Sequence, residues 1–570
     1  MAKILPALAL LGNLVPTTAS HVNSTFTNPI LPGFHPDPSC IFVPAWDKSY
    51  FCASSSFNAF PAIPIHASRD LQSWKLIGNA ISRPEMLPGL ATTNKSTSGI
   101  WAPTLRYDKK EERFWISTTL VFDDLPSDDL SRWDNFVIST TDPFNSTSWT
   151  DPMHFEFEGY DTSLFWDDDG QVYVTGSHEY KVWPGIQTAT IDLHTGRTGT
   201  WNNPWNGTGG LAPEGPHIYK KDGYYYLMLA EGGTGLGHMV TMARSKNING
   251  LYEPAPHNPL LTNANTTAFF QTVGHADLFQ DADGNWWAAA LSTRSGPDFK
   301  NYPMGRETVL TPVTWDSGEW PIFQAVSGTE SGWGQPPRPV LVSQGEGPYI
   351  RTADDLTFPP NSALPLHLIH WRLPTSDTYR VSPPGYEGSL VLRSSVLNLT
   401  SFDGSSTEGK GQTFIGRRQT DSLFTYTLDI NASDLRDEED EVGVSIVLLS
   451  ANSTQFPTGL TPFFRFRGMS GAPVPEGLSP FPSYMTIDTP ITIQIKALNW
   501  THYSFAAGPR DAQHLIQTYG FARGEQLSWG FTGTLIGPYA TTNGREGSEN
   551  GAFEAAVGNW TYIPQGQIIS

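Results

Sequence analysis

The amino-acid sequence predicts an all-β protein in which a five-bladed β-propeller is followed by a β-sandwich. Two features lead to this prediction. The 53 glycines and 46 prolines among 570 residues indicate a chain rich in turns, and long stretches with helical periodicity are hard to find. One short pattern also recurs five times in the first part of the chain and then stops. Because 570 residues exceed what one ordinary core supports, two domains are expected.

The recurring pattern is a short apolar strand, a turn and a second strand rich in aromatic residues. It is easiest to see in residues 161–170, which read DTSLFWDDDG. Aligned without gaps, the five copies begin at Asp37, Ala102, Asp161, Glu214 and His275. These starts are 65, 59, 53 and 61 residues apart, and several turns contain Asp-Gly, a strong signal for a β-hairpin. Five hairpins with a period of about 60 residues predict propeller blades of four strands over residues 26–335.

The first strand of each propeller blade lines the central channel, so the five starting residues should form a ring around one axis. Three carboxylates and one histidine would then share one funnel, where like charges raise one another's pKa and resist loss of water. Taken alone, Asp37 would be an Asp-Pro turn and Glu214 an exposed loop residue. Their place in the ring favours a functional site instead. Glu214 also lies within APEGP, whose side chains offer no hydrogen bonds, so its carboxyl should stay protonated.

Further candidates lie near the ring, and each has a structural alternative. Phe57 and Trp101 lie next to inner strands and either stack on a substrate or belong to the core. His275 is either a metal or water ligand on the axis or a hydrogen-bonded core residue. Arg294, with Arg306 further along the last blade, either binds substrate hydroxyls or pairs with a ring carboxylate.

The chain has two cysteines, Cys40 and Cys52, which flank a hairpin whose turn lies near Trp46. In a symmetric hairpin they lie opposite each other on one face, which favours a disulfide over free core thiols. Two thiols are too few for a typical zinc site. The three aspartates at 167–169 lack the other ligands of a calcium-binding loop and predict a hairpin turn.

Charge and the first residues of the chain predict its partners and location. A net charge of −21 argues against nucleic acid and anionic membranes as partners, which leaves a neutral substrate. Residues 1–20 contain Lys3, an apolar run and small residues, the pattern of a secretory signal peptide. Ten sequons between Asn23 and Asn559 suit a secreted, extracellular glycoprotein. No cofactor is predicted to be required, while a structural calcium ion on the propeller axis and the oligomeric state stay open.

After Trp333 the composition changes and the period of about 60 residues ends. Residues 334–339, GQPPRP, predict a linker, and residues 340–570 predict a β-sandwich. Strands are expected at 425–430, 442–449 and 492–496. The charge run at 434–441 predicts a solvated loop.

Three motifs resemble those of glycoside hydrolase family 43, namely HPDPS around Asp37, DTSLFWDDDG from Asp161 and EGPHIYK from Glu214. The resemblance is strongest to β-xylosidases and α-L-arabinofuranosidases that carry a second domain, a concanavalin-like sandwich of jelly-roll type. FIGRRQ at 414–419 and FTGTLIG at 531–537 are similar to that domain, so the resemblance covers nearly the whole mature chain. One departure is Thr162, where many members have proline, which leaves the backbone beside Asp161 less constrained.

The resemblance implies a secreted hydrolase of the plant cell-wall polysaccharides xylan and arabinoxylan, which releases terminal β-xylose or α-L-arabinofuranose with inversion. It implies that Asp37 is the general base and Glu214 the general acid, and that Asp161 orients Glu214 and tunes its pKa. It implies substrate contacts from Trp101, Phe57, His275, Arg294 and, from the second domain, Phe531.

The ring geometry agrees with inversion. An inverting pair needs carboxyl groups about 6.5–9.5 Å apart, so that a water fits between the base and the sugar, and opposite blades are separated on that scale. Two alternatives stay open, namely an endo-arabinanase with an open groove on the same propeller and a glycan-binding propeller without chemistry. The sequence does not decide between xylose and arabinofuranose.

Overall fold

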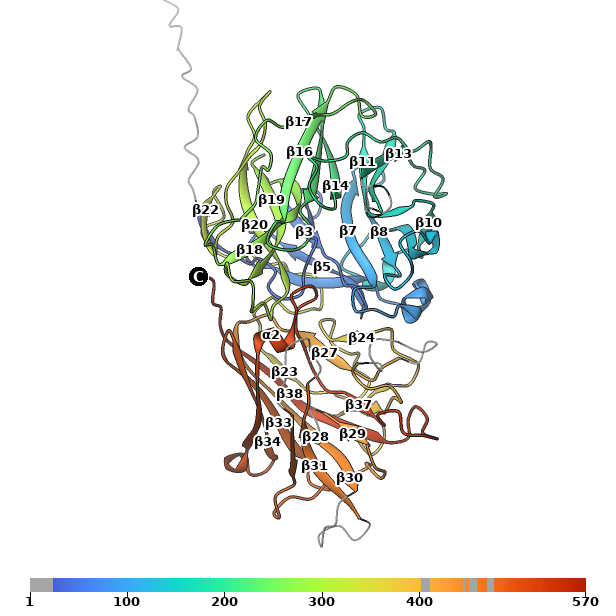
Figure 1. Ribbon diagram of the computed structural model, residues 1–570, viewed down its shortest axis with the longest axis vertical. Coiled ribbons are helices and arrows are strands. Elements are labelled where there is room, and N and C mark those ends of the chain that lie inside the picture. The colour runs from blue at the N-terminus through green and yellow to red at the C-terminus, as the bar shows by residue number, and fades with distance from the viewer. Residues whose placement is uncertain are drawn as a thin grey trace, which may run out of the picture.

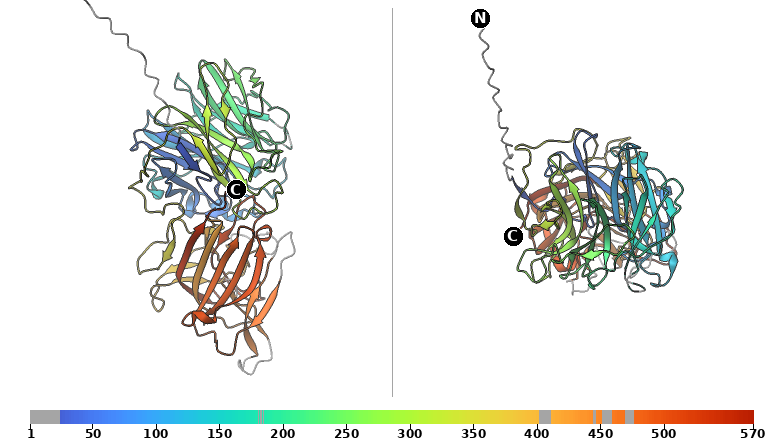
Figure 2. Two further views of the ribbon diagram at one scale, coloured as in Figure 1. Left: turned by 90° about the vertical axis from the view of Figure 1, so that its left-hand side faces the viewer. Right: turned by 90° about the horizontal axis from the view of Figure 1, so that it is seen from above.

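The computed structural model describes residues 24–570 apart from 180, 182, 184, 401–410, 444–445, 451–458 and 469–475. The predicted signal peptide at 1–20 lies outside the described residues. Two all-β domains are stacked along the longest axis of the molecule (Figure 1, Figure 2). Within the described residues, no helix is long and apolar enough to cross a membrane.

Five sheets surround the central channel of the first domain, four with four strands and the third with three. The first sheet consists of β2 (Ser39–Val43), β3 (Ser49–Ala53), β5 (Ala62–Ser68) and β6 (Lys75–Ile81). The second consists of β7 (Gly99–Asp108), β8 (Arg113–Val121), β9 (Trp133–Thr140) and β10 (Met153–Phe155). The third consists of β11 (Gly159–Trp166), β12 (Val172–His178) and β13 (Gly185–Thr190). The fourth consists of β14 (Glu214–Lys221), β15 (Tyr224–Glu231), β16 (Met239–Ser245) and β17 (Glu253–Pro254). The fifth consists of β18 (Phe270–Gln280), β19 (Trp286–Arg294), β20 (Arg306–Thr314) and β21 (Ile322–Phe323).

The all-β class and the five-bladed propeller are therefore confirmed, with one difference in the third blade. The outer edge of that blade is reduced to two isolated bridges, Thr188 with Asn202 and Ile191 with Thr198. The turn chemistry explains the hairpins. Asp222 and Gly223, which connect β14 to β15, have φ angles of 51° and 72°, and Asp-Gly adopts this left-handed pair of conformations readily.

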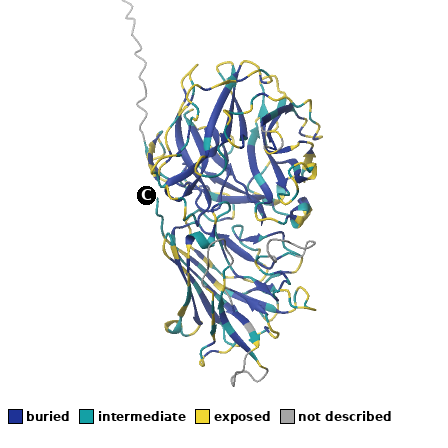
Figure 3. Ribbon diagram, in the orientation of Figure 1, coloured by how far each residue is buried: buried dark blue, intermediate teal, exposed yellow. Residues whose placement is uncertain are grey.

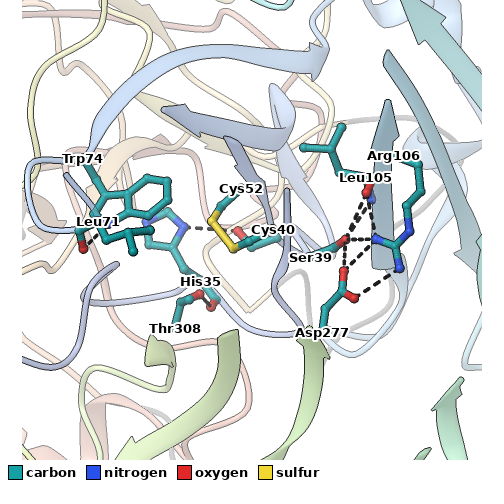
Figure 4. Close-up of a disulfide and its surroundings, with 11 residues drawn as sticks. His35, Ser39, Cys40, Cys52, Leu71, Trp74, Leu105, Arg106, Asp277 and Thr308 are labelled. Carbon is teal, nitrogen blue, oxygen red and sulfur yellow. Dashed lines mark hydrogen bonds and ion pairs between the residues drawn. A yellow bond between two sulfur atoms is a disulfide. The ribbon is translucent and has the colours of Figure 1, made fainter. Parts of the chain in front are cut away.

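The disulfide between Cys40 and Cys52 is also confirmed. The two residues lie directly opposite each other in β2 and β3, with Cα atoms 4.2 Å apart (Figure 4). Both cysteines are buried, with Cys40 1% and Cys52 0% exposed. The bond therefore cross-links the inner strands of the first blade within the core.

The second domain is a sandwich of two sheets. The larger has the strand order β25 (Tyr379–Val381), β26 (Leu390–Arg393), β38 (Glu554–Gly566), β28 (Leu423–Asn431), β33 (Ile491–Asn499), β34 (His502–Pro509) and β35 (Gln517–Arg523), with β23 (Asp354–Leu356) beside β38. The smaller has the order β32 (Gly477–Pro480), β31 (Leu460–Phe466), β30 (Ile446–Ser450), β29 (Glu441–Val442) and β37 (Ala540–Thr541). Alternate residues of β28 are buried between the sheets, as its apolar pattern requires.

Two local predictions for this domain are wrong. The strand expected at 442–449 is instead a hairpin, because β29 and β30 pair antiparallel, with Val442 opposite Ile446. The charge run at 434–441 is not solvated throughout, since Asp440 is 1% and Glu441 3% exposed. Both carboxylates form ion pairs, Asp440 with Arg545 at 2.6 Å and Glu441 with Arg465 at 2.8 Å. These positive charges offset the cost of removing the carboxylates from water.

The two domains share a sheet. Strand β4 (Ala59–Phe60) of the propeller pairs with β24 (Ile369–Trp371), and β27 (Ile415–Arg418) and β36 (Leu535–Ile536) continue this sheet into the sandwich. At the propeller edge, β1 (Ser24–Thr27) pairs with β22 (Thr329–Gly332). Buried residues continue from the inner strands across the contact between the domains (Figure 3). The sandwich is thus fixed against the propeller through the pairing of β4 with β24.

Candidate active site

The inner strands carry an irregularity near the same end of the central channel. Asp37, Ala102, Asp161, Gly215 and His275 all have left-handed φ angles, between 32° and 55°. In β7, β11, β14 and β18 the strand register shifts at this point, as in a β-bulge. Left-handed backbone is strained for residues other than glycine and concentrates at functional sites, where it aims side chains.

The register of the fourth blade corrects the predicted ring. Gly215, not Glu214, occupies the position equivalent to Asp161 and His275, and Glu214 is one residue earlier in its strand. A Cβ atom at residue 215 would lie 2.9 Å from the ring of His275, so this position requires glycine. Glu214 still lines the same pocket as Asp37 and Asp161. The three carboxylates therefore converge as predicted, although Glu214 reaches the pocket from a different register.

Asp37 is held as an anion. Its Oδ1 accepts a hydrogen bond from Arg306 Nη1 at 2.9 Å, and its Oδ2 accepts one from Ser55 Oγ at 2.6 Å. His275 Nδ1 lies 3.7 Å from Oδ1. Burial alone would raise the pKa of Asp37, but the charge of Arg306, with His275 and Ser55, outweighs burial and lowers it. An ionised carboxylate that accepts protons is the form a general base needs.

Glu214, in contrast, is held in its protonated form. Its Oε2 accepts a hydrogen bond from Tyr160 Oη at 3.2 Å. Burial, and then the negative charge of Asp37, raise the pKa of Glu214 from 4.5 to about 7. At mildly acidic pH this carboxyl keeps its proton and can donate it, while Asp37 stays ionised.

Asp161 lies beside Glu214. Its Oδ2 accepts a hydrogen bond of 3.0 Å from the backbone N–H of Gly215, the peptide unit that follows Glu214. Burial and the charges of Glu214 and Asp37 raise the pKa of Asp161 well above its ordinary value. Asp161 therefore fixes the backbone that carries Glu214 and competes with it for the proton.

The raised pKa of Glu214 predicts a pH-dependent gain in stability for Glu214→Gln. Below pH about 4.5 the carboxyl is protonated in the folded and unfolded chain, so the gain is absent; it grows as pH rises and is complete above about 7. The change in pKa corresponds to about 3 kcal/mol, which partial exposure in the pocket reduces to about 2. Calorimetric melting temperatures at pH 4.5 and 8 measure this difference.

Glu549→Gln is the matched control, because Glu549 is exposed in the second domain. Its melting temperature should follow the wild type at both pH values. If the melting temperature of Glu214→Gln differed from that of the wild type by the same amount at pH 4.5 and pH 8, the pKa of Glu214 would not be raised.

The carboxylates open into a cavity of about 350 Å³ with aromatic walls. Phe57, Trp101 and Phe531 all line it, as do two residues that stack on each other, Trp133 and Tyr160, with ring centroids 5.3 Å apart. Trp101 donates its indole N–H to the carbonyl of Thr97 at 2.8 Å, which fixes the orientation of the ring. The pocket thus combines charged groups at its base with apolar rings around them, as sites for small ligands do.

Phe531 comes from the second domain and is anchored to the propeller. Its carbonyl accepts a hydrogen bond from Arg306 Nε at 3.0 Å, and the guanidinium lies 4.2 Å from the centroid of its ring. Its ring also meets that of Phe57 edge-on, at 4.8 Å. The arginine that holds Asp37 therefore holds the aromatic residue from the sandwich as well.

Arg294 does not lie where it was expected. It is 3% exposed, pairs with Glu307 at 2.6 Å and donates to Ser422 of the second domain, and it does not line the pocket. Arg306 occupies the pocket instead. Arg294 is the last residue of β19 and Arg306 the first of β20, and only the register between these strands decides which one turns toward the channel.

Other pocket residues were not predicted. Arg132 pairs with Asp123, and its Nε lies 3.9 Å from Glu179 Oε2; all three line the pocket. Asp123 lies in a turn and Arg132 ends a short 3-10 helix, Leu130–Arg132, both outside the recurring pattern, so the repeat gives no signal for them. Tyr160 immediately precedes Asp161, and this adjacency to a ring carboxylate is the one signal in the sequence for its hydrogen bond to Glu214.

Beneath the pocket, polar side chains fill the channel. Asp277 accepts hydrogen bonds from Ser39 at 2.6 Å and Arg106 at 2.7 Å (Figure 4) and from Tyr219 at 2.7 Å. His275 lines both the pocket and the smaller cavity beneath it, as Asp37 and Asp161 do. No group of three or more His, Cys, Asp or Glu side chains is arranged to hold a metal ion in the described part of the chain.

Comparisons with known proteins agree with these features. Residues 26–321 match the family model of glycosyl hydrolases family 43. Over 560 residues the chain is 31% identical to a non-reducing end alpha-L-arabinofuranosidase of Bacteroides ovatus, and this match covers 96% of this chain and 97% of that protein. It is 38% identical over 302 residues to a xylosidase/arabinosidase of Humicola insolens, and this match covers 51% of this chain and 54% of that protein.

Solved structures show the same two-domain architecture. The Bacteroides ovatus xyloglucan PUL GH43B structure superposes with a TM-score of 0.78 at 31% identity, over 95% of this chain and 100% of that chain. A xylan beta-1,4-xylosidase from Bacillus halodurans superposes with a TM-score of 0.76 at 25% identity, over 94% and 99% of the two chains.

Proposed function

Because the chain belongs to glycosyl hydrolases family 43 and is a glycoside hydrolase, we propose that it removes terminal pentoses from hemicellulose with inversion of the anomeric configuration. The observation that carries this proposal is the division of charge in the pocket. Asp37 is stabilised as an anion by Arg306, while Glu214 keeps its proton to about pH 7. One carboxylate that takes up a proton and one carboxyl that gives one up are what a single-displacement hydrolysis needs.

In this mechanism Asp37 is the general base. Its carboxylate draws a proton from a water molecule, whose oxygen attacks the anomeric carbon. Ser55 and Arg306 fix both of its oxygens, so the base is oriented before the substrate arrives. As the oxygen of the glycosidic bond departs, Glu214 gives it a proton from the other face of the sugar. No resident cofactor takes part in these steps.

Asp161 positions the acid. By accepting the N–H of Gly215 it fixes the peptide that follows Glu214. Burial and the charge of Glu214 raise the pKa of Asp161 well above its ordinary value, so Asp161 can itself hold a proton beside Glu214 once the acid has lost its own.

We assign to Arg306 the sugar contact first expected of Arg294. Arg306 lines the pocket, and among the described residues its Nη2 has no hydrogen-bond partner. A buried donor that faces a pocket is suited to a sugar hydroxyl, because leaving it unpaired is costly.

Exo action is supported by the size of the pocket. A cavity of about 350 Å³ is near the lower end of the range of about 300–1,000 Å³ for small-ligand sites, so it suits one or two sugar units. Secretion is part of the proposal and rests on residues 1–20 and the sequons. The similarity to a non-reducing end alpha-L-arabinofuranosidase over nearly the whole chain favours α-L-arabinofuranose over β-xylose.

The experiment that tests the proposal compares nitrophenyl α-L-arabinofuranoside, nitrophenyl β-xyloside, arabinoxylan and linear arabinan. We expect hydrolysis of at least one pentoside and release of monosaccharides from arabinoxylan from the first minutes. Rapid shortening of arabinan into oligosaccharides would favour an endo-arabinanase instead. Binding of the polysaccharides without any hydrolysis would contradict catalysis.

Phe531→Ala should lower kcat/KM about ten-fold on nitrophenyl pentosides. Its ring forms part of the pocket wall and packs on Phe57 and Arg306, so its loss exposes both the bound sugar and Arg306 to water. Steady-state kinetics measure the effect. Phe521→Ala is the matched control, since Phe521 is 55% exposed and lies outside the pocket. An unchanged kcat/KM in Phe531→Ala would exclude Phe531 from the substrate site.

A further inference from the structure

A second, smaller cavity lies between the domains, separate from the active site. Its volume is about 50 Å³. Propeller strand residues, the connecting segment and the sandwich all contribute to its lining, and most of its polar side chains are basic. These are His35, His66, Arg351, His367, Arg417 and Arg418, with one carboxylate, Asp354.

Arg418 is the unusual member of this lining. It is 6% exposed, and its Nε donates to the carbonyl of Phe34 at 2.9 Å. Its Nη2 has no hydrogen-bond partner, and no carboxylate forms an ion pair with it among the residues that the structure describes. Burial lowers the pKa of Arg418 to about 10, so it keeps its charge at neutral pH. The guanidinium also lies 5.4 Å from the centroid of the Phe34 ring, but neither this ring nor the carbonyl carries a negative charge. A buried charge without a counter-charge is costly, which points to a missing counter-ion.

The neighbouring arginines already have carboxylates. Arg417 Nη1 lies 2.8 Å from Asp354 Oδ2. Arg351 feels the negative charges of Asp421 and Glu307 and the positive charge of Arg294, which is the ion-pair partner of Glu307. Four guanidinium groups therefore face three carboxylates, and one positive charge, that of Arg418, stays unbalanced.

The nearest histidines do not change this count. His35 and His66 meet edge-on with ring centroids 4.8 Å apart, and they are 4% and 3% exposed. Burial, with the charge of Arg418, lowers the pKa of His66 to about 3, so it is neutral at the pH where the protein is folded and active. Its Nδ1 has no hydrogen-bond partner in the described structure. A neutral imidazole that carries a proton on this nitrogen is a donor for an anion.

We propose that this cavity binds one small monovalent anion of the size of chloride, with Arg418 as its main charged partner and His66 as a hydrogen-bond donor. A cavity of about 50 Å³ has room for an ion of this size, because one water-sized particle needs about 10–15 Å³ by this measure. Gluconate, a six-carbon carboxylate, is much larger than chloride or bromide. Water could satisfy the donors, but only an anion balances the charge.

The position of the cavity gives the anion a structural role. Arg418 belongs to β27, in the sheet that joins the sandwich to β4. The carbonyl that it binds belongs to Phe34, three residues before Asp37. The anion would therefore link the sandwich to the segment that presents Asp37.

The test measures thermal unfolding of the full chain in sodium gluconate, with chloride or bromide replacing gluconate at constant ionic strength. We expect a saturable rise in melting temperature of roughly 2–3 °C with either halide, because a ligand that binds only the folded state stabilises it. Arg418→Gln should remove this dependence. Arg436→Gln is the matched control, since it removes the same charge from a side chain that is 73% exposed in the same domain.

Crystals grown in sodium bromide give a second readout that does not require the variant to fold. An anomalous peak within hydrogen-bond distance of Arg418 supports the proposal. The proposal is overturned if the wild-type melting temperature is the same in gluconate and chloride and the bromide crystals show no such peak, because the cavity then holds water only. A halide effect that persists undiminished in a folded Arg418→Gln variant would also overturn it.

Discussion

Glu214→Gln is expected to lower kcat by about 10²–10⁴-fold on xylo-oligosaccharides or arabinoxylan while largely sparing dinitrophenyl pentosides. A natural glycoside must have its departing oxygen protonated, and the amide of glutamine has no acidic proton to give. A dinitrophenolate leaves without this help, so its release is nearly independent of the acid. The ratio of the two losses, measured by steady-state kinetics, isolates proton donation from general damage to the pocket.

The same variant should also lose one limb of the pH profile. Activity of the wild type on natural substrates falls as pH rises through the pKa of Glu214, about 7, because the acid must be protonated. On dinitrophenyl pentosides the Gln variant should show no such fall. Glu179→Gln is the matched control, because Glu179 is buried in the same pocket without the role of acid. Equal losses of Glu214→Gln on both leaving groups would remove Glu214 from that role.

Asp37→Asn should lower kcat by at least about 10³-fold on both classes of substrate. Attack by water is needed whatever the leaving group, and an asparagine cannot take the proton. The substitution also leaves Arg306 without its anionic partner, so the folded state must be checked by calorimetry.

Asp123→Asn provides the comparison for Asp37, since Asp123 also lines the pocket and pairs with an arginine. A folded Asp37→Asn variant that keeps wild-type activity on dinitrophenyl pentosides would rule out Asp37 as the base. A similar loss in Asp123→Asn would indicate that any charge change in the pocket is enough to stop the reaction.

The recurring pattern predicted most of the catalytic framework, because it reports the strand register directly. Asp37, Asp161 and His275 occupy equivalent positions in three blades, as their spacing indicated. The gapless alignment puts Glu214 at the position that Gly215 occupies in the structure. The reason is a contact between the inner strands of two neighbouring blades, where the ring of His275 leaves no room for a side chain at Gly215, and a gapless alignment contains no such information.

The rest of the pocket depends on contacts between distant segments. Arg306 and Phe531 meet across 225 residues of chain, and no local periodicity encodes that meeting. Phe531 was reached through family resemblance, and the structure brings it to the pocket wall. The family resemblance implies a sugar contact from Arg294, but Arg294 ends one strand and Arg306 begins the next, and only the folded register shows which of them reaches the pocket. The burial of Glu441 was missed for a similar reason, since its partner Arg465 lies on another strand.

The anomeric configuration of the first product tests the central claim most directly. If Asp37 activates water on one face of the sugar while Glu214 protonates the leaving group on the other, each turnover inverts the anomeric centre. Proton NMR during the first minutes, before mutarotation, should then show α-xylose from a β-xyloside or β-L-arabinofuranose from an α-L-arabinofuranoside. Initial release of the retained anomer would contradict the account, because it requires one carboxylate to attack the sugar itself.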